Sequence, residues 1–406
     1  MTTTNSTDNE NMFNFNKEST NDEEDINPED YTFQNWDDST VDLNKKLLRG
    51  IYSYGFEKPS PIQKKAVIPM VMKKDVIAQA QSGTGKTGAF TIGTIQLVDH
   101  TKKNVQAIII SPTRELSKQT YDVLCSISGL LKTKVKLLIG GTSTGHDIKD
   151  LKDNVPHIIV GCPGRIHDMA RRKYFDTKTV ELIVLDEADE MLSTGFKEQV
   201  YNIFQYLNND VQICLFSATM PRELSALTER FMRNPVKILV KQEMLTLEGI
   251  AQYYIALEDD AQKYATLKDI FKIISLSQCI IYCNSVKRVS DLYEAMKEDQ
   301  FPVCTIHSNM ERDERTQSYD DFKIGKYRVL ISSNVTARGI DIQQVSTVIN
   351  FDIPKCVHTY LHRIGRSGRW GRKGTGINFV TKRDVPRIKQ IEQHYGTEIK
   401  EMPSQL

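Results

Sequence analysis

Short runs of consecutive apolar residues alternate with helix-length segments along most of the chain, and no other feature of the sequence limits the fold as strongly. The first six runs are residues 76–78, 106–110, 135–139, 157–160, 182–185 and 212–216. Strands that are apolar on both faces are typical of a parallel sheet with helices on each side. The sequence therefore predicts an α/β architecture.

The same alternation occurs again in the C-terminal part of the chain, in residues 278–282, 303–306, 328–331, 347–350 and 376–380. Between the two sets lies a polar stretch, residues 241–249, that has no strong periodicity. We expect this stretch to be a linker between an N-terminal domain, residues 32–240, and a C-terminal domain, residues 250–406. Both lengths are ordinary for a domain.

Acidic residues are concentrated at the N-terminus. The chain has 406 residues and a formal net charge of +1, but residues 1–31 contain nine acids and one lysine, so they carry −8 and the remainder carries +9. A polar segment without hydrophobic periodicity cannot bury enough apolar surface to fold, so we expect a disordered acidic tail. The basic remainder permits a polyanionic partner, although an ordinary solvated surface explains a charge of this size equally well.

Composition also bears on the compartment. Hydrophobic residues make up 39% of the chain, and no apolar run approaches the roughly 20 residues that span a bilayer, so we expect no membrane association. The seven cysteines include no C-x-x-C pair, and the N-terminus has no secretory pattern. We therefore expect a reducing compartment, the cytoplasm or alternatively the nucleus. Cys214 and Cys279 lie in apolar runs, where we expect buried thiols.

The strongest local motif is residues 80–87, Ala-Gln-Ser-Gly-Thr-Gly-Lys-Thr, between a predicted strand and a helix-like segment. Glycines let backbone N–H groups surround phosphate oxygens at the positive end of a helix. Lys86 can then reach the outer phosphates, and Thr87 can ligate Mg²⁺. Ala80 stands where the usual pattern begins with glycine. A chance Gly/Ser turn followed by lysine is the alternative, which the flanking strand disfavours.

Acidic residues end the apolar run 182–185, in the order Asp186-Glu187-Ala188-Asp189. Open α/β sheets present their functional loops at this end of the strands. Beside a phosphate loop, Asp186 is suited to holding Mg²⁺ through water, and Glu187 to orienting or deprotonating the attacking water. An exposed acidic turn or a helix N-cap gives the same four letters, so this interpretation depends on the phosphate loop.

A basic segment, residues 360–369, lies deep in the second predicted domain and reads Tyr-Leu-His-Arg-Ile-Gly-Arg-Ser-Gly-Arg. A basic patch, for nucleic acid or merely solvated, is one interpretation. Arginines three residues apart, however, project from one side of a helical turn, and a guanidinium from a second domain can contact a γ-phosphate. We therefore predict an active site in a cleft between the domains, where domain closure senses ATP.

These three motifs and their neighbours resemble the DEAD-box family of ATP-dependent RNA helicases from about residue 33 to residue 400, and within it the translation initiation factor 4A group. The matching segments are residues 55–63, 80–87, 112–116, 140–141, 163–165, 186–189, 217–219, 337–341 and 362–369. The resemblance implies two tandem RecA-like domains, each a mainly parallel sheet covered by helices on both faces. It also implies ATP and Mg²⁺ as cofactors and RNA, single-stranded or duplex, as the partner.

On the nucleotide side, the resemblance implies a role for each matching residue. Gln63 would read the adenine edge, and Phe56 would stack on the ring. The full set expected to contact ATP is Phe56, Lys58, Gln63, Ala80, Gln81, Ser82, Gly83, Thr84, Gly85, Lys86, Thr87 and Asp341. Thr87 and Asp186 would hold Mg²⁺. The residues expected to take part in catalysis are Glu187, Asp186, Lys86, Arg366 and Arg369.

On the RNA side, the resemblance implies two further groups. The residues expected to couple hydrolysis to RNA binding are Asp189, Ser217, Thr219 and His362. The residues expected on the sugar–phosphate backbone are Thr113, Arg114, Gly141, Gly164, Arg165 and Arg338. Backbone contacts carry no base information, so binding should be sequence-independent and salt-sensitive.

The sequence departs from the family pattern at two places on the RNA side. Cys162 stands where the family usually has threonine, and Ser333-Asn334 stand where it usually has Thr-Asp. Loss of the hydroxyl at Cys162 would remove one phosphate hydrogen bond, so we expect altered RNA affinity or altered stimulation by RNA.

Together these features predict a monomeric, RNA-stimulated ATPase that locally unwinds RNA or remodels ribonucleoprotein in translation initiation, with a scaffold-type protein partner of the initiation-factor kind. An ATP-gated RNA clamp that nucleates a protein assembly would use the same residues and stays an alternative. A phosphate-loop kinase of a small molecule is disfavoured, because it leaves the second domain and the pair Arg366 and Arg369 without a role.

Overall fold

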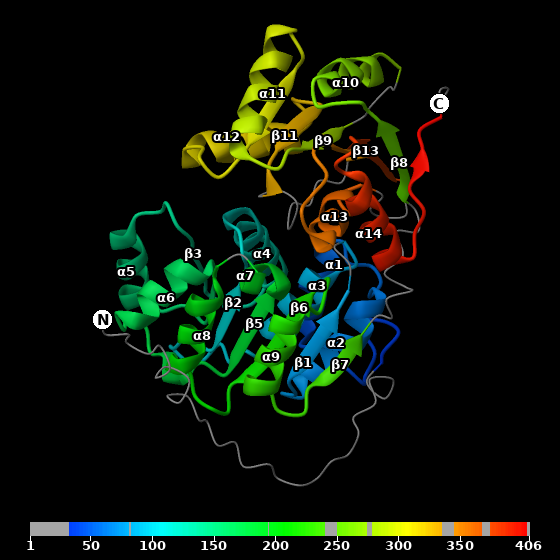
Figure 1. The fold of residues 1–406 in the computed structure, drawn as a ribbon. Coiled ribbons are helices and arrows are strands. Elements are labelled where there is room, and N and C mark those ends of the chain that lie inside the picture. The colour runs from blue at the N-terminus through cyan, green and yellow to red at the C-terminus, as the bar shows by residue number, and fades with distance from the viewer. Residues whose placement is uncertain are drawn as a thin grey trace, which may run out of the picture.

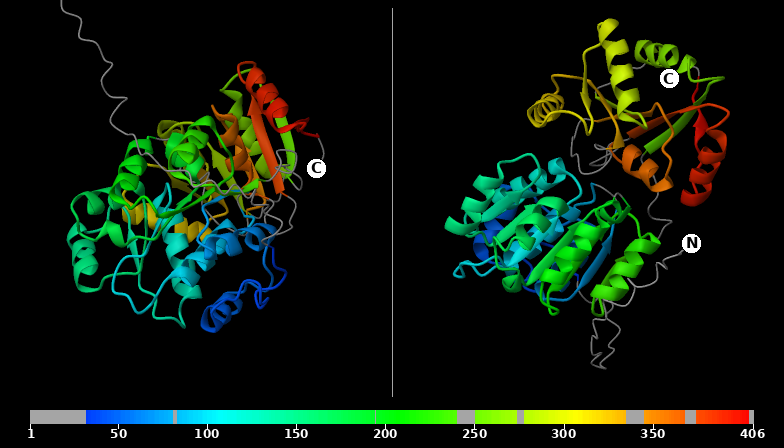
Figure 2. Two further views of the ribbon diagram at one scale, coloured as in Figure 1. Left: turned by 90° about the horizontal axis from the view of Figure 1, so that it is seen from below. Right: turned by 60° about the vertical axis from the view of Figure 1, so that its left-hand side comes forward.

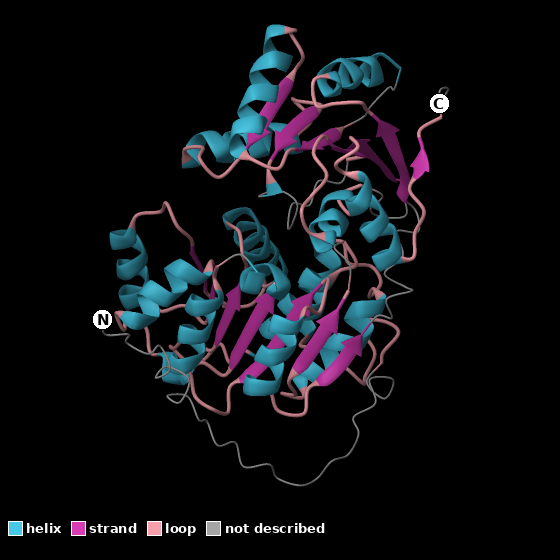
Figure 3. Ribbon diagram, viewed as in Figure 1, coloured by secondary structure: helices cyan, strands magenta, loops and turns pink. Residues whose placement is uncertain are grey.

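Two parallel β-sheets with helices packed around them make up the protein, as Figures 1 and 3 show. The computed structural model describes residues 32–80, 83–193, 195–239, 250–273, 278–334, 345–367 and 374–403. Every strand pairing within these residues is parallel, which confirms the predicted α/β class. Among the helices described, none has the length and apolar character needed to cross a membrane.

The first domain contains a seven-stranded sheet in the order β3-β4-β2-β5-β6-β1-β7. Its strands are β1 (Val76–Gln79), β2 (Ala107–Ile110), β3 (Val135–Leu138), β4 (Ile158–Gly161), β5 (Leu182–Asp186), β6 (Gln212–Ser217) and β7 (Val236–Leu239). Its helices are α1 (Lys45–Ser53), α2 (Pro61–Val71), α3 (Lys86–Leu97), α4 (Arg114–Ile127), α5 (Thr144–Asp153), α6 (Pro163–Arg171), α7 (Ala188–Ser193), α8 (Lys197–Tyr206) and α9 (Arg222–Phe231).

The second domain contains another seven-stranded sheet, in the order β10-β11-β9-β12-β13-β8-β14. Its strands are β8 (Ile250–Ala256), β9 (Cys279–Tyr282), β10 (Val303–Ile306), β11 (Val329–Ser332), β12 (Thr347–Asn350), β13 (Gly374–Val380) and β14 (Lys400–Glu401). Its helices are α10 (Gln262–Ile273), α11 (Val286–Glu298), α12 (Arg312–Lys323), α13 (Val357–Ile364) and α14 (Val385–Tyr395).

Each sheet has an apolar core on both faces, because successive side chains of a strand point to opposite sides. In β2, Ile109 belongs to the core that includes α1 to α4. The preceding residue, Ile108, belongs to the core on the other face, which includes α6 to α9. A strand between two cores needs a continuous apolar run, and this is the pattern that the sequence shows. Cys214 and Cys279 are fully buried, as predicted.

All the predicted strands are present, with ends that differ from the predicted ends by at most two residues. Three strands were not predicted. Lys237 interrupts the apolar run of β7, and both residues of β14 are exposed. β8 is half-exposed along most of its length, so it lacks the continuous apolar run of a buried strand. The predicted linker, residues 241–249, lies outside the described residues.

The strand order of the first sheet places the predicted motifs side by side. β6 lies between β1 and β5, and all three run in parallel. The segments that follow these strands, which are the phosphate loop, residues 186–189 and residues 217–219, therefore emerge at one carboxyl edge.

The second domain contacts the first at this edge. Figures 1 and 2 show α13 at the boundary between the domains. His362 of α13 lies 3.2 Å from Asp189, and α12 reaches the loop after β3 and the first turn of α4. The basic segment that includes His362 thus lies next to residues 186–189 of the first domain.

Candidate active site

The phosphate loop joins β1 to α3 and is held at its start by the neighbouring strand. The backbone N–H of Ala80 donates to the carbonyl of Ser217 at 3.0 Å. Gly83 and Gly85 have φ angles of 83° and 99°, in the left-handed region where a side chain is strained. Gly85 is the N-cap of α3, so the loop ends where backbone N–H groups and the helix dipole favour an anion. The described end of the loop, residues 83–85, therefore has a backbone form that suits phosphate binding.

Gln63 lies against the phosphate loop. Its Nε2 donates to the carbonyl of Gly85 at 3.1 Å, and its Oε1 accepts from the backbone N–H of Ser60 at 2.8 Å. A Cβ atom on Gly88 would lie 2.4 Å from Gln63 Nε2 and 3.0 Å from the Phe56 ring, so a side chain at this position in α3 would displace the Gln63 amide. A carboxamide has two donors and two acceptor sites, so Gln63 can bind an adenine edge while it keeps both bonds.

The acidic residues after β5 surround Lys86. Its Nζ lies 3.3 Å from Glu187 Oε1, and the two side chains are only 5% and 4% exposed. Asp186 is buried beside them; burial, and then the neighbouring charge of Glu187, raise the pKa of Asp186 to about 7, while Lys86 acts in the opposite direction. Glu187 has a φ of 51°, which is strained for a residue with a side chain. Two buried carboxylates thus share one ammonium group.

An excess of buried carboxylate is the condition that a divalent cation relieves. Mg²⁺ prefers oxygen ligands and is usually held by one or two carboxylates together with water and substrate phosphates. Asp186 and the hydroxyl of Thr87, in the first turn of α3, are oxygen ligands of this type. Across the described ranges, no group of three or more His, Cys, Asp or Glu could hold a metal ion by itself. These residues therefore fit a Mg²⁺ that binds together with a nucleotide.

A buried, hydrogen-bonded group connects the acidic segment to the second domain. Thr219 Oγ1 donates to Asp189 Oδ2 at 2.5 Å, and His362 Nε2 lies 3.2 Å from the same oxygen. Ser217 Oγ accepts from the backbone N–H of Asp189 at 3.4 Å and donates to the carbonyl of Thr219 at 2.8 Å. All four side chains are buried. These bonds therefore join α13 to the segment that begins at Asp186.

Arg366 follows α13 and is buried, and its Nε donates to the carbonyl of His362 at 3.2 Å. The guanidinium thus lies beside the group that contacts Asp189. Lys58 is exposed, and Thr84 is half-buried in the loop. The remaining predicted residues, Gln81, Ser82, Arg338, Asp341 and Arg369, lie outside the described residues, so their roles stay predictions.

Three residues predicted to bind RNA, Thr113, Arg114 and Gly141, lie together at the edge of the first domain. They come from two separate motifs, residues 112–116 and residues 140–141. Thr113 is the N-cap of α4, and its hydroxyl accepts from the N–H of Leu116 at 3.3 Å. Arg114 begins that helix and packs against the glycines after β3, where a Cβ atom on Gly141 would lie 3.1 Å from Arg114 Nη1. Gly141 has a φ of 83°, so the loop favours glycine at this position, and a side chain there would also displace the Arg114 guanidinium slightly.

Arg165 is bonded to the same loop, the one that follows β3. It donates to Asp147, and to the hydroxyl and carbonyl oxygens of Thr142 at 3.2 and 3.1 Å. Lys136 also pairs with Asp147, at 3.1 Å. Gly164 has open space where a side chain would begin. The guanidinium of Arg165 thus holds the loop after β3 in place. A contact with RNA, as predicted, would have to use the same N–H groups that bond to Asp147 and Thr142.

The two departures from the family pattern have defined surroundings. Cys162 is the N-cap of α6 but makes no side-chain hydrogen bond to that helix, and its Sγ lies 3.6 Å from Ser117 Oγ. Burial raises the pKa of the Cys162 thiol to about 11, so the thiol is neutral. Asn334 accepts from Nε and Nη2 of Arg363, at 3.0 and 2.6 Å.

Sequence reasoning missed the contacts that α12 makes with the first domain. Arg315 Nη2 lies 2.7 Å from Glu115 Oε2, and Arg312 Nη1 donates to the carbonyl of Gly141 at 3.1 Å. The prediction for Arg366 and Arg369 was based on arginines three residues apart. The same spacing in α12 could have identified this second pair.

Sequence reasoning also missed Arg363, which is fully buried between the strand ends of the second sheet. Besides Asn334, its guanidinium donates to Asn350 Oδ1 at 3.1 Å, Asn284 Oδ1 at 2.8 Å and the carbonyl of Asp352 at 2.8 Å. All these acceptors are neutral, and burial lowers the pKa of Arg363 to about 10. Arg363 therefore ties α13 to its own sheet, whereas its neighbours His362 and Arg366 lie at the boundary with the first domain.

Models of two protein families match this chain. The family described as DEAD/DEAH box helicase matches residues 60–227, and the one described as helicase conserved C-terminal domain matches residues 262–371. The matched ranges contain most of the residues that meet at the domain boundary.

Whole proteins match nearly the entire chain. Eukaryotic initiation factor 4A of Caenorhabditis elegans is 48% identical over 93% of this chain and 93% of its own. Eukaryotic initiation factor 4A-III homolog A of Oryza sativa subsp. japonica is 49% identical over 89% of each. The structure of S. cerevisiae Dbp5 bound to RNA and ADP BeF3 superposes with a TM-score of 0.84 at 33% identity, covering 90% of this chain and 95% of that one. Because one superposition includes both domains, their arrangement here is similar to that in the Dbp5 complex.

Proposed function

Because the chain belongs to the DEAD-box family of ATP-dependent RNA helicases, we propose that it opens short RNA duplexes or remodels ribonucleoprotein locally, with translation initiation as its setting. The observation that carries the proposal is the buried contact of Asp189 with His362, which links the acidic segment of one domain to the arginine-bearing helix of the other. Such a link makes hydrolysis depend on domain closure. The similarity to initiation factor 4A supports the setting.

On the nucleotide side, the phosphates of ATP would lie at the N-terminus of α3. Lys86 would then bond to the outer phosphates instead of Glu187, which leaves Glu187 to orient the attacking water. Thr87 and Asp186 would hold Mg²⁺, which supplies charge neutralisation on the phosphates. Arg366 would add positive charge from the second domain as the domains close.

The base and sugar of the nucleotide would be recognised at the edges of the loop. Gln63 would bind the adenine edge, which is supported by its bond to the carbonyl of Gly85 in the loop and by the ring of Phe56 beside it against α3. Asp341 would contact the ribose, and Arg369 would join Arg366 at the γ-phosphate. A two-way amide contact of this kind favours ATP over GTP.

RNA would lie along the surface formed by Thr113, Arg114 and Gly141, with Gly164 and Arg165 beside it. Arg338 would contribute from the second domain. These residues offer hydroxyl, guanidinium and backbone N–H donors to phosphates, so binding would be sequence-independent and would weaken with salt. Closure of both domains on one strand would bend that strand and release its complement.

The test is steady-state ATP hydrolysis with and without single-stranded RNA, in the intact chain and in Glu187→Gln. We expect RNA to stimulate hydrolysis at least about tenfold, and the variant to lose the stimulated activity because it cannot orient the attacking water. Hydrolysis that does not respond to RNA, in a preparation where Glu187→Gln is inactive, would contradict the proposal and would point to Cys162 and Asn334 as the cause.

A second function, an ATP-gated clamp on RNA, is favoured by the contacts between the domains. Besides the contact of His362, the ion pair of Arg315 with Glu115 and the bond of Arg312 to Gly141 hold the domains together. A long-lived closed state would suit a clamp that nucleates a protein assembly. Pre-steady-state kinetics separate the two functions, because many ATP turnovers per RNA dissociation event indicate a helicase, and fewer than one indicates a clamp.

We also propose that residues 241–249 are the linker and that the protein acts as a monomer in the cytoplasm with a scaffold-type partner. The linker lies between the last strand of the first sheet and the first strand of the second. Partial proteolysis should cut there first and leave two fragments that keep their secondary structure.

A further inference from the structure

A hollow of about 820 Å³ lies in the first domain, away from the candidate active site. It is lined by residues just before β2, β4 and β5 begin, such as Val105, Val155 and Thr179, and by the ends of α5, α6 and α8. Figure 1 shows these three helices together on one flank of the domain. Because β5 starts near the hollow and ends at Asp186, the length of a strand, about 17 Å, separates the two places.

The side chains around the hollow are strongly basic. The charged residues of the lining are Lys103, Lys152, Arg171, Lys173, Lys178 and Asp176. Asp176 accepts from the backbone N–H of Lys178 at 2.9 Å and so stabilises its own turn. Within the described part of the chain, Lys103, Lys152 and Lys173 form no ion pair. The hollow therefore has positive charge that the first domain itself does not neutralise.

The walls of the hollow are fixed, and its floor is apolar. Thr177 Oγ1 donates to the carbonyl of Tyr206 at 2.8 Å, and Thr179 Oγ1 donates to the carbonyl of Val105 at 2.8 Å. These bonds tie the segment after α6 to the end of α8 and to the segment before β2. Phe175 is buried and lines the floor. A preformed site loses little conformational entropy when a ligand binds.

Two features of the lining favour a peptide over RNA. Asn104 Oδ1 is buried, and within the described residues it accepts no hydrogen bond, so it requires a donor. A peptide backbone supplies an N–H donor at nearly every residue, whereas the phosphodiester groups that a basic surface attracts only accept, and RNA donates only from its 2′-hydroxyls and base edges. Bases also need a ring on which to stack, but Phe175 is buried, Lys152 lies over the Tyr174 ring at 5.7 Å, and the Tyr206 ring is stacked with His167, so little ring surface is left for a base.

We propose that this hollow is a docking site for an acidic peptide segment of a partner protein. Carboxylates of the segment would pair with Lys152, Lys173 and Lys103, an apolar side chain would pack on the floor, and a backbone N–H would donate to Asn104. The proposal does not depend on the helicase reaction, because none of these residues belongs to the candidate active site. A failure of one would therefore leave the other intact.

The test uses the full-length protein and a fluorescently labelled eight-residue peptide, six glutamates with a central Leu-Tyr pair. Fluorescence anisotropy at low ionic strength measures its binding, and the same peptide with glutamine in place of glutamate is the control probe. We expect the double variant Lys152→Glu with Lys173→Glu to weaken binding of the acidic peptide at least tenfold. Absence of binding by the parent chain, or equal binding of both peptides, would overturn the proposal.

A matched control separates the hollow from net charge. The double variant Lys297→Glu with Lys389→Glu makes the same charge change on exposed helices of the second domain. Lys297 also lies over an aromatic ring, that of Tyr293, at 5.7 Å, so it matches Lys152 in its local contact. We expect this control to change peptide affinity less than twofold. An equal loss in both double variants would overturn the proposal in favour of a non-specific charge effect.

Two other occupants, RNA and the chain's own acidic segment, are each distinguished by one further experiment. If Lys152→Glu with Lys173→Glu raises the RNA concentration for half-maximal ATPase stimulation as much as it weakens the peptide, the hollow is an RNA surface and the proposal is overturned. A full-length chain whose nine acids in residues 1–31 are changed to amides tests the other occupant. If only that chain binds the probe, the chain's own acidic segment occupies the hollow and the assignment to a partner is overturned.

Discussion

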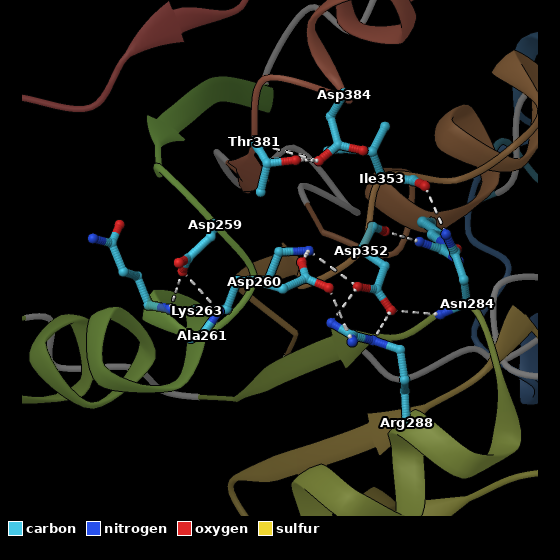
Figure 4. Close-up of polar contacts among 12 residues, drawn as sticks. Asp259, Asp260, Ala261, Lys263, Asn284, Arg288, Asp352, Ile353, Thr381 and Asp384 are labelled. Atoms are coloured by element: carbon cyan, nitrogen blue, oxygen red, sulfur yellow. Dashed lines mark hydrogen bonds and ion pairs between the residues drawn. The ribbon is translucent and has the colours of Figure 1, made fainter.

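Each domain has a buried cluster of charged residues at the carboxyl ends of its strands, but the two clusters balance their charges differently. In the first domain, Asp186 and Glu187 share the single ammonium group of Lys86. In the second, the one carboxylate of Asp352 is contacted by two cations, and Figure 4 shows Arg288 directed toward it. In the first cluster two carboxylates lie near one cation, and in the second two cations contact the central carboxylate.

The cluster around Asp352 is a structural one. Lys263 and Arg288 lie 3.1 and 2.8 Å from its Oδ1, and the backbone N–H of Asn284 donates to its Oδ2 at 3.0 Å. Asp260 also pairs with Lys263, at 2.8 Å, and with Arg288, at 3.2 Å. These contacts join α10, α11 and the end of β12. Because its charges are satisfied within the domain, this cluster needs no ligand, whereas we propose that a metal ion and phosphates complete the cluster around Asp186.

Exchanging Asp186 for Asn should have the largest effect on activity. We expect RNA-stimulated ATP hydrolysis to fall at least about 100-fold, because the variant removes a carboxylate that would hold Mg²⁺. We expect stability without nucleotide to stay the same or to rise, because the variant relieves repulsion between buried carboxylates. ATPase assays and thermal unfolding measure the two effects. A variant that is inactive because it is unfolded would contradict this account.

The corresponding exchange in the second cluster, Asp352→Asn, should have the opposite pattern. It leaves the buried Lys263 and the half-buried Arg288 without their shared carboxylate, so we expect a loss of about 3 kcal/mol in the free energy of unfolding. The folded fraction should keep most of its ATPase activity. Urea unfolding of the second domain measures the loss. A change below about 1 kcal/mol would mean that Asp260 alone satisfies both cations.

The dependence of stability on pH should distinguish the clusters further. The pKa of Asp186 is raised, so between pH 4 and pH 7 the native state holds a proton that the unfolded chain has released. The stability that this proton gives is present at low pH and is lost as the pH rises toward 7. Asp186→Asn removes this dependence on pH. Without Mg²⁺ or nucleotide, the melting temperature of the variant minus that of the parent should therefore increase from pH 5 to pH 8. A constant difference would contradict the raised pKa.

The smallest expected effect concerns Arg363, whose acceptors are all neutral. Asn334→Asp would place a carboxylate where the amide oxygen now accepts two of its hydrogen bonds, and we expect a gain of about 1 kcal/mol in stability. Asn334→Leu, which has a similar size but no acceptor, is the matched control and should destabilise the domain. Thermal unfolding of the three chains measures the order. If Asn334→Asp is the less stable chain, the guanidinium is already balanced by Asp352.

Sequence reasoning succeeded where the signal is local. The apolar runs identified the strands between two cores. The segments at strand ends singled out Lys86, Glu187 and His362, which lie in buried polar contacts, and their roles stay predictions. It failed for β8, since a half-exposed strand has no continuous apolar run. It also failed for the pair Arg315 and Glu115, because neither residue has a local pattern that names a partner 200 residues away.

The sequence by itself determined the two α/β domains and the positions of the phosphate loop and the acidic segment at strand ends, because each depends on residues that are close in the chain. Only the tertiary structure decided that Asp189 meets His362, that two carboxylates share Lys86 while two cations share Asp352, and that lysines from separate segments surround one hollow. Strand order and domain packing bring these groups together. Charge balance in a buried site is set by such long-range neighbours, and local sequence carries no record of them.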